Sequence, residues 1–247
     1  MCFVLVALQA PPRYPLILLA NRDEFYDRPA EPMHKWDGPR GLIAGRDLKS
    51  GGTWMGVDEN SGKLALVTNF REPEAKPGER SRGLLVLDFF RSELDTFEQQ
   101  LSHHADSYSG FNLLYGTPGD LRYFSNRGGR AEQISPGVHG LSNGLLDEAW
   151  PKVVRGREML EDVLKIEEPD RESLCRILED RVAAPDDQLP ETGVSLELER
   201  MLAPIFIETE RYGTRCSSLL MVDSGGGFTV MEKTHRTGDL AVFEFKV

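Results

Sequence analysis

The second residue of the chain is a cysteine, and its position adds to the chemistry of its side chain. Removal of the initiator methionine would leave Cys2 with a thiol and a free α-amine on one residue. The α-amine has a reference pKa of about 7.7–8.0, so it can accept the thiol proton without help from a histidine. A nucleophile activated in this way is established chemistry. The alternative is a buried cysteine on a first strand, which is common.

Four consecutive polar residues, Asn21 to Glu24, follow an apolar segment that can pair with the segment containing Cys2. Arg22 could hold a thiolate or a substrate carboxylate, and Asp23 could orient an ammonium group. The alternative is a solvated cluster of charges at a strand end. Because these four residues are expected to lie beside the start of the chain, we weight the functional interpretation and the solvated cluster equally.

Two asparagines and an arginine stand next to other expected strands. Asn69 closes the apolar segment 64–68, and Asn143 lies in the sequence Gly-Leu-Ser-Asn-Gly. Their amides could donate to a developing oxyanion, although asparagine also favours turns through local hydrogen bonds. Arg215 precedes an apolar strand, where it could bring positive charge to a site or cap the strand end in solvent.

Two patterns argue against other kinds of site. The sequence Gly51-Gly52-Thr53-Trp54 lacks the lysine of a phosphate-binding loop and opens a strand rather than a helix. We expect its glycines to allow close backbone approach and Trp54 to fill a core or a pocket. The five histidines show no metal-ligand spacing, so zinc binding is not expected.

Composition narrows the function classes further. The chain has 29 Lys and Arg against 40 Asp and Glu, and its formal net charge of −11 disfavours nucleic acid as a partner. No stretch approaches the ~20 apolar residues that span a bilayer, and no basic segment precedes the apolar start, so we expect neither membrane insertion nor a signal peptide. The three cysteines, Cys2, Cys175 and Cys216, are widely spaced, which indicates a reducing compartment and by default the cytoplasm.

Hydrophobic periodicity sets out the elements that must position these residues. Strands are expected over residues 2–8, 16–20, 41–45, 53–57, 63–69, 111–115, 121–125, 131–134, 216–222, 228–233 and 240–246. Helices are expected over residues 84–90, with Ser81 as the N-cap, and over 95–104, 151–164 and 171–182. Residues 11–15 are expected to be a turn, and segments 28–40 and 71–80 are expected to be loops.

The order of these elements predicts an α+β fold. Strands, two helices, strands, two helices and strands follow one another along residues 1–247 without a convincing linker, which favours one domain. Two sheets stacked face to face, with a helix pair outside each, would bury every apolar face in this order.

Several motifs in order resemble those of the NRDE family, also called the transport and Golgi organization protein family. The resemblance covers residues 2 to about 222 and rests on Met1-Cys2, Asn21-Arg22-Asp23-Glu24, Gly51-Gly52-Thr53-Trp54, Thr68-Asn69-Phe70-Arg71, Ser81-Arg82-Gly83, Phe111-Asn112-Leu113-Leu114, Gly140-Leu141-Ser142-Asn143 and Gly213-Thr214-Arg215. The family is similar in turn to N-terminal nucleophile hydrolases of the cysteine type, which cleave conjugated bile acids and penicillin V.

This resemblance implies an αββα four-layer sandwich and the hydrolysis of a small-molecule amide without a cofactor. By position, the implied catalytic residues are Cys2 as nucleophile, Arg22 and Asp23 as its partners, Asn69 and Asn143 as oxyanion donors, and Arg215 as electrostatic support. The implied ligand-binding residues are Asn21, Glu24, Trp54 and Phe70.

The sequence departs from those hydrolases at one point, because they separate their arginine and aspartate by two residues. Adjacent residues on a strand face opposite sides, so Arg22 and Asp23 can both reach Cys2 only if the backbone turns. Glu24 is therefore the alternative partner of the amine. The family is also associated with secretory organisation, haem trafficking and acyl-lipid metabolism. Two further hypotheses are a non-catalytic carrier of haem or an acyl group, and a scaffold whose motifs serve folding alone.

Overall fold

The first two apolar segments pair as an antiparallel hairpin, as the sequence predicts. β1 (Cys2–Leu8) and β2 (Leu16–Phe25) run in register from Cys2 opposite Arg22 to Leu8 opposite Leu16. These pairings belong to a computed structural model that describes the chain apart from residues 1, 11–12, 74–77 and 167, and for Cys2 the backbone alone. The expected removal of Met1, the start of the turn at 11–15 and part of the loop at 71–80 therefore concern positions outside the described residues.

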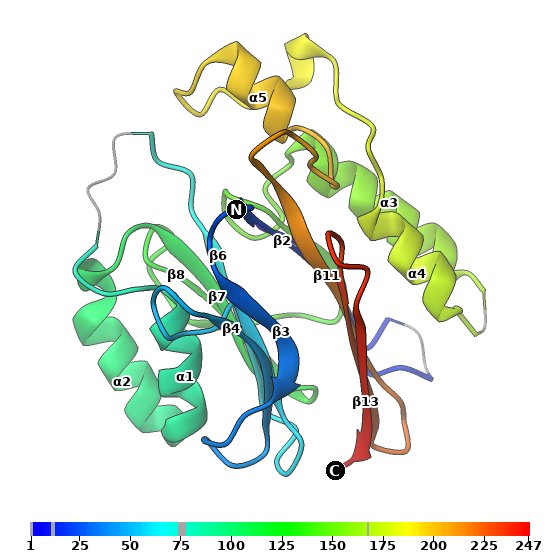
Figure 1. Cartoon of the computed structure of the whole chain (residues 1–247). Helices are drawn as coiled ribbons and strands as arrows, with labels where there is room; N and C mark the ends of the chain where they lie inside the picture. Colours follow the sequence, from blue (N-terminus) through cyan, green and yellow to red (C-terminus); the bar gives the residue numbers. More distant parts are fainter. Residues whose placement is uncertain (1, 11–12, 74–77, 167) are drawn as a thin grey trace.

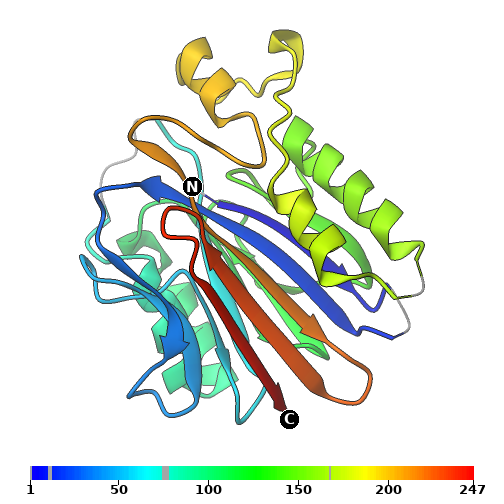
Figure 2. The same cartoon turned by 45° about the vertical axis from the view of Figure 1, so that its right-hand side comes forward.

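The hairpin belongs to a six-stranded antiparallel sheet. Its strand order is β10, β1, β2, β11, β12 and β13, so the last strands of the chain extend the sheet that the first strands begin. The added strands are β10 (Gly137–Leu141), β11 (Tyr212–Val222), β12 (Gly227–Thr234) and β13 (Leu240–Lys246). Figure 2 shows β2, β11, β12 and β13 side by side.

The strands that lie in the sequence between β2 and β10 form a second, seven-stranded antiparallel sheet. Its order follows the chain, so each strand pairs with the one before it. The strands are β3 (Ala30–Lys35), β4 (Leu42–Asp47), β5 (Met55–Asp58), β6 (Leu64–Asn69), β7 (Phe111–Thr117), β8 (Asp120–Ser125) and β9 (Glu132–Gln133).

Buried side chains of both sheets form a shared core, and helices pack on the outer faces. The inter-sheet core contains Val4 and Leu18 from one sheet and Leu66 from the other. The α1–α2 pair packs on the seven-stranded sheet and the α3–α4 pair on the six-stranded sheet (Figure 1). The helices are α1 (Gly83–Arg91), α2 (Leu94–His104), α3 (Pro151–Leu164), α4 (Arg171–Leu178) and the short α5 (Leu196–Leu202). Within the described ranges, no helix combines the length and apolar character needed to cross a membrane.

Alternation along β2 sorts its residues between two cores. Leu18 packs between the sheets, whereas Leu19 packs against α3 and α4. The strand pairs with its neighbours as far as Phe25, so the alternation continues through its polar end. Arg22 therefore faces the other sheet, and Asp23 lies on the opposite face of the strand.

The prediction of an α+β fold with two stacked sheets is confirmed, and both sheets are antiparallel, but four local features differ from the expectations. Segment 28–40 contains β3, an edge strand in which Met33 alone is buried, so no apolar alternation marks it. Strand β10, which was not expected, has glycine at two of its five positions. The helix expected over 171–182 ends at Leu178, and Val182, which lies beyond this end, is 52% exposed and packs against no apolar face of the described chain. The short helix α5 was also not expected.

The Gly51-Gly52-Thr53-Trp54 segment passes the start of α1 at short range, as expected for its glycines. The N–H of Thr53 donates to the carbonyl oxygen of Gly83 at 3.1 Å. A Cβ on Gly52 would lie 2.5 Å from the carbonyl carbon of Gly83 and 2.6 Å from its oxygen. Backbone atoms cannot rotate out of the way as a side chain can, so residue 52 must be glycine for the loop to reach the helix.

We predict that Gly52→Ala lowers the free energy of unfolding by about 1–3 kcal/mol, because the added methyl overpacks a backbone contact. Urea titration measures the change. Gly119→Ala is the matched control, because no heavy atom lies within 4 Å of a Cβ built there. If the two variants unfold at the same urea concentration, the close approach of residue 52 to α1 does not limit stability.

Candidate functional site

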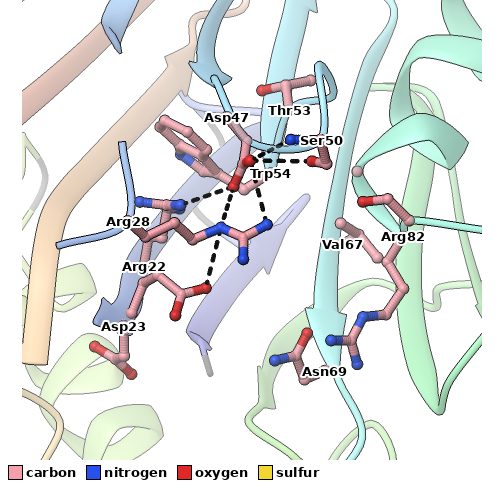
Figure 3. Close-up of a pocket in the computed structure, with 13 residues that line it drawn as sticks. Arg22, Asp23, Arg28, Asp47, Ser50, Thr53, Trp54, Val67, Asn69 and Arg82 are labelled. Atoms are coloured by element: carbon pink, nitrogen blue, oxygen red, sulfur yellow. Dashed lines mark hydrogen bonds and ion pairs between the residues drawn. The ribbon is translucent and has the colours of Figure 1, made fainter. Parts of the chain in front are cut away.

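A pocket of about 120 Å³ opens where β2, β4 and β6 end. It is lined by Arg22, Asp23, Glu24, Arg28, Asp47, Ser50, Thr53, Trp54, Val67, Asn69, Ser81, Arg82 and Gly83. Figure 3 shows Arg22, Arg28 and Asp47 on one side of the pocket and Asn69 and Arg82 on the other. Both sheets and the start of α1 therefore contribute to one polar site.

The carboxylate of Asp47 is the shared acceptor on one side of the pocket. Arg28 donates to it through Nε at 2.6 Å and Nη2 at 3.2 Å, and Arg22 donates through Nη2 at 3.4 Å. The N–H of Ser50 also donates to it, at 2.9 Å. Burial raises the pKa of Asp47, but the Arg28 guanidinium and the Ser50 N–H outweigh it and hold the pKa below the ordinary value. The charged carboxylate thus links β2 of one sheet to β4 of the other.

The indole ring of Trp54 supports the Arg22 guanidinium on one face. Arg22 Cζ lies 4.1 Å from the ring centroid, and the residue is 7% exposed. Stacking of this kind stabilises a desolvated guanidinium. The ring itself occupies the space that a side chain at Gly45 would take, since a Cβ there would lie 2.1 Å from Trp54 Cζ2.

Asp23 lies on the opposite face of β2 from Arg22, as strand alternation predicts. It is 1% exposed, and its Oδ1 accepts a 2.7 Å hydrogen bond from Thr214 Oγ1. Burial raises the pKa of Asp23 above the ordinary value of an aspartate. The register of β11 shifts by one residue at Arg215, so Thr214 pairs with Asp23 while Cys216 pairs with Arg22.

Asn21, expected among the ligand-binding residues, is directed away from the pocket. Its Nδ2 donates to the carbonyl oxygens of Leu178 at 2.8 Å and Ile205 at 3.0 Å. These two bonds fix the orientation of the amide, so its Oδ1 accepts the 2.6 Å bond from Ser217 Oγ. Ser217 Oγ is then the acceptor in its 2.7 Å contact with His235 Nε2, so His235 does not act as a base toward the serine. Asn21 joins the sheet to the helices.

The two predicted oxyanion donors lie in different environments. Asn69 lines the pocket, and Asn143 is fully buried and donates through Nδ2 to the carbonyl oxygen of Asn69 at 2.8 Å. Asn143 is absent from the described lining of the pocket. It holds the backbone of Asn69, which is part of that lining. Phe70, another expected ligand-binding residue, is also absent from that lining, and its N–H donates to Gly110 O at 2.9 Å.

Arg215 binds the backbone of the segment that carries Arg28. Its Nη1 donates to the carbonyl oxygens of Phe25 and Arg28, both at 2.8 Å. Burial, together with the positive charge of Arg22, lowers the pKa of Arg215. The side chain therefore holds the segment after β2 in place, and its charge acts on the pocket from behind that segment.

Sequence reasoning missed several residues of the lining, above all Arg28, Asp47 and Arg82. Asp47 followed by Ser50 after a strand is typical of a turn capped by a side chain, but this pattern says nothing about Arg22 of β2 or about Arg28 in the loop that follows β2. Ser81 was expected to cap α1, whereas Arg82 occupies the N-cap position and no side chain caps the helix. Both residues line the pocket instead.

The backbone of Cys2 lies at the beginning of β1, opposite Arg22, which is in turn opposite Cys216 on β11. The side chain of Cys2 is outside the described part of the chain, so its role as a nucleophile stays a prediction. The described residues hold no group of three or more His, Cys, Asp or Glu side chains that could bind a metal ion.

We predict that Asp47→Asn lowers the free energy of unfolding at pH 7 by about 2–4 kcal/mol, because it leaves a buried arginine without its anion. The difference from the native protein should shrink in acid. The pKa of Asp47 is lowered in the folded state, so its stabilisation is complete above the unfolded value near 3.8 and is lost as the pH falls through the folded pKa. Urea titrations at pH 7 and pH 3 measure both effects.

Asp186→Asn is the control for this change, because Asp186 and its partner Arg200 have side chains that are 52% and 56% exposed. An exposed pair contributes little, so this variant should unfold almost like the native protein. A loss in Asp47→Asn that is no larger than in the control would show that Asp47 does not hold the arginines.

Comparison with known proteins places this sequence in a family. A family model described as Transport and Golgi organisation 2 matches residues 1–237. The Transport and Golgi organization protein 2 homolog of Bos taurus is 35% identical over 90% of this chain and 87% of its own length. The homolog of Homo sapiens is 33% identical over 94% and 90%, and the Drosophila melanogaster protein is 26% identical over 95% and 92%.

Proposed function

The chain belongs to the Transport and Golgi organisation 2 family, and from that premise and its pocket we propose that it is a cysteine hydrolase of the N-terminal nucleophile type. Cys2 is the nucleophile, and the substrate is a small molecule with an amide C–N bond. Residues 1–247 form one αββα domain in this proposal. We place the reaction in the cytoplasm, where a thiol stays reduced.

The register of the β1–β2 hairpin is the observation that carries this function. It puts the backbone of Cys2 opposite Arg22, and Arg22, Asp23 and Asn69 line one pocket. A thiol nucleophile needs a positive charge near the thiolate, an acceptor for an ammonium group and a donor for an oxyanion. The pocket offers one side chain of each kind beside the start of β1.

The proposed reaction begins when the thiol of Cys2 gives its proton to its own α-amine, which is free once the initiator methionine has been removed. The thiolate attacks the amide carbonyl carbon, a C–S bond forms, and the carbonyl oxygen becomes an oxyanion. The C–N bond then breaks, and the amine leaves with the proton from the α-ammonium group. Water hydrolyses the thioester to a carboxylic acid and restores the thiol.

We assign the remaining roles from the contacts of each side chain. Arg22 stabilises the thiolate, and Asp23 holds the ammonium group in preference to Glu24, whose Oε2 lies 3.6 Å from Arg28 Nε. Asn69 donates to the oxyanion. Asn143 positions Asn69 through its 2.8 Å hydrogen bond. Arg215 provides electrostatic support from behind the segment that carries Arg28.

A non-catalytic carrier of haem or an acyl group is the alternative. Both ligands are largely apolar, whereas six of the pocket-lining residues carry ionisable side chains: Arg22, Asp23, Glu24, Arg28, Asp47 and Arg82. A charged lining around about 120 Å³ favours a small polar substrate, and these residues do not fit haem.

We predict that a β-lactam probe adds its whole mass to the native protein, because opening of its strained amide by a thiol releases no fragment. Intact mass should also show loss of Met1, and peptide mapping should locate the adduct on Cys2. Cys2→Ala should give no adduct and no amide hydrolysis.

Cys175→Ala is the control, because Cys175 is a partly buried thiol away from the pocket and burial raises its pKa. It should react as the native protein does. Retention of Met1 together with the absence of an adduct would overturn the terminal-amine mechanism.

A further inference from the structure

A second pocket, of about 280 Å³, lies at α1 and α2, away from the site described above. Leu85 of α1 and Phe97 and Leu101 of α2 form its apolar side. Arg80, His104 and Tyr108 provide polar groups around it. An apolar wall combined with converging polar groups is typical of a small-molecule site.

Tyr108 gives this pocket an unusual feature. The residue is 3% exposed, and its ring is fixed between the edge of Phe111, at 5.8 Å, and the Arg80 guanidinium, at 5.3 Å. Its hydroxyl oxygen is buried and finds no hydrogen-bond partner anywhere in the described chain. Two deeply buried tyrosines of the neighbouring strands differ, since Tyr115 of β7 donates a 2.7 Å bond to Glu98 and Tyr123 of β8 donates one to Asn112.

The groups around Tyr108 define what could satisfy it. Burial raises the pKa of Tyr108, so the phenol keeps its proton and can donate. Arg80 adds donors and positive charge, and it pairs at 3.1 Å with Asp88, whose carboxylate lines the same pocket. A carboxylate ligand would take the place of Asp88 on Arg80 and would accept the unused donor of Tyr108 as well.

The volume limits the size of the ligand. A cavity of about 150 Å³ holds benzene, so a pocket of 280 Å³ admits roughly ten to twelve non-hydrogen atoms. We propose that this pocket binds a small carboxylate with an aromatic or branched apolar body. The carboxylate accepts from Tyr108 Oη and Arg80, and the body packs against Leu85, Phe97 and Leu101.

The binding test uses 3-phenylpropionate as the probe and the full chain labelled for NMR. Titration of the native protein should shift amide signals of α1 and α2, and Tyr108→Phe should weaken binding by about 10- to 100-fold, because a hydrogen bond to a charged group is lost. The neutral analogue 3-phenylpropan-1-ol should bind the native protein more weakly than the acid. Tyr123→Phe, which removes a satisfied hydroxyl elsewhere, should bind the acid as the native protein does.

A second measurement does not depend on the probe. Without ligand, Tyr108→Phe should have a Tm equal to or above that of the native protein, because it removes a buried hydroxyl that lacks a partner. Tyr123→Phe breaks two hydrogen bonds, to Asn112 and from the Leu146 N–H, and its Tm should fall by at least about 3 °C.

Three results would overturn the proposal. One is binding of the acid that maps away from α1 and α2, or no binding at all. Another is equal affinity of native and Tyr108→Phe protein for the acid. The third is a Tm of Tyr108→Phe as low as that of Tyr123→Phe, which would mean that the hydroxyl already has a partner in the free protein.

Discussion

The two-residue alternation of β2 is the constraint on which the site depends. The strand is paired along both edges, with β1 and β11, and its two faces are covered by the other sheet and by α3 and α4. Its polar end obeys the same rule as its apolar beginning. Arg22 therefore faces the other sheet at the pocket, whereas Asn21 binds carbonyl groups on the helix side and Asp23 accepts from Thr214 of β11 at the edge of the same pocket. One short motif thus provides both the chemistry of the pocket and the attachment of the helices that cover the sheet.

The buried charges of the pocket are stabilised because several donors share one acceptor. A single carboxylate, Asp47, accepts from two arginines and also closes the turn that leads to Ser50, so its cost of desolvation is offset by several bonds at once. On the far wall, Arg82 donates to the carbonyl oxygen of Gly110 at 3.0 Å. The short segment before α1 serves two cavities, with Arg82 in the lining of one and Arg80 in the lining of the other.

Most of the fold could be predicted from residue patterns, because alternation and turn residues mark strands that are buried on at least one face. The edge strand β3 and the glycine-containing β10 carry little of this signal, so they were missed. For the site, hairpin pairing was enough to bring Cys2 and Arg22 together, since that contact is local in the chain. Asp47 and Arg82 reach the pocket through packing of one sheet on another and of α1 on its sheet, which no local pattern encodes. Asn143 shows the same limit, because its residue type does not reveal its buried hydrogen bond to the carbonyl oxygen of Asn69.

The bulge at Arg215 has a consequence for how the chain can change in length. The extra residue shifts the register of β11 by one, so that Thr214 pairs with Asp23 and Cys216 pairs with Arg22. Removing or adding one residue between Thr214 and Cys216 would turn every later side chain of the strand to the wrong core. Deletions and insertions among relatives should therefore be excluded from this stretch even where individual residues are replaced. A conserved spacing between Thr214 and Cys216, more than any single residue type, is the expected evolutionary signature of this part of the site.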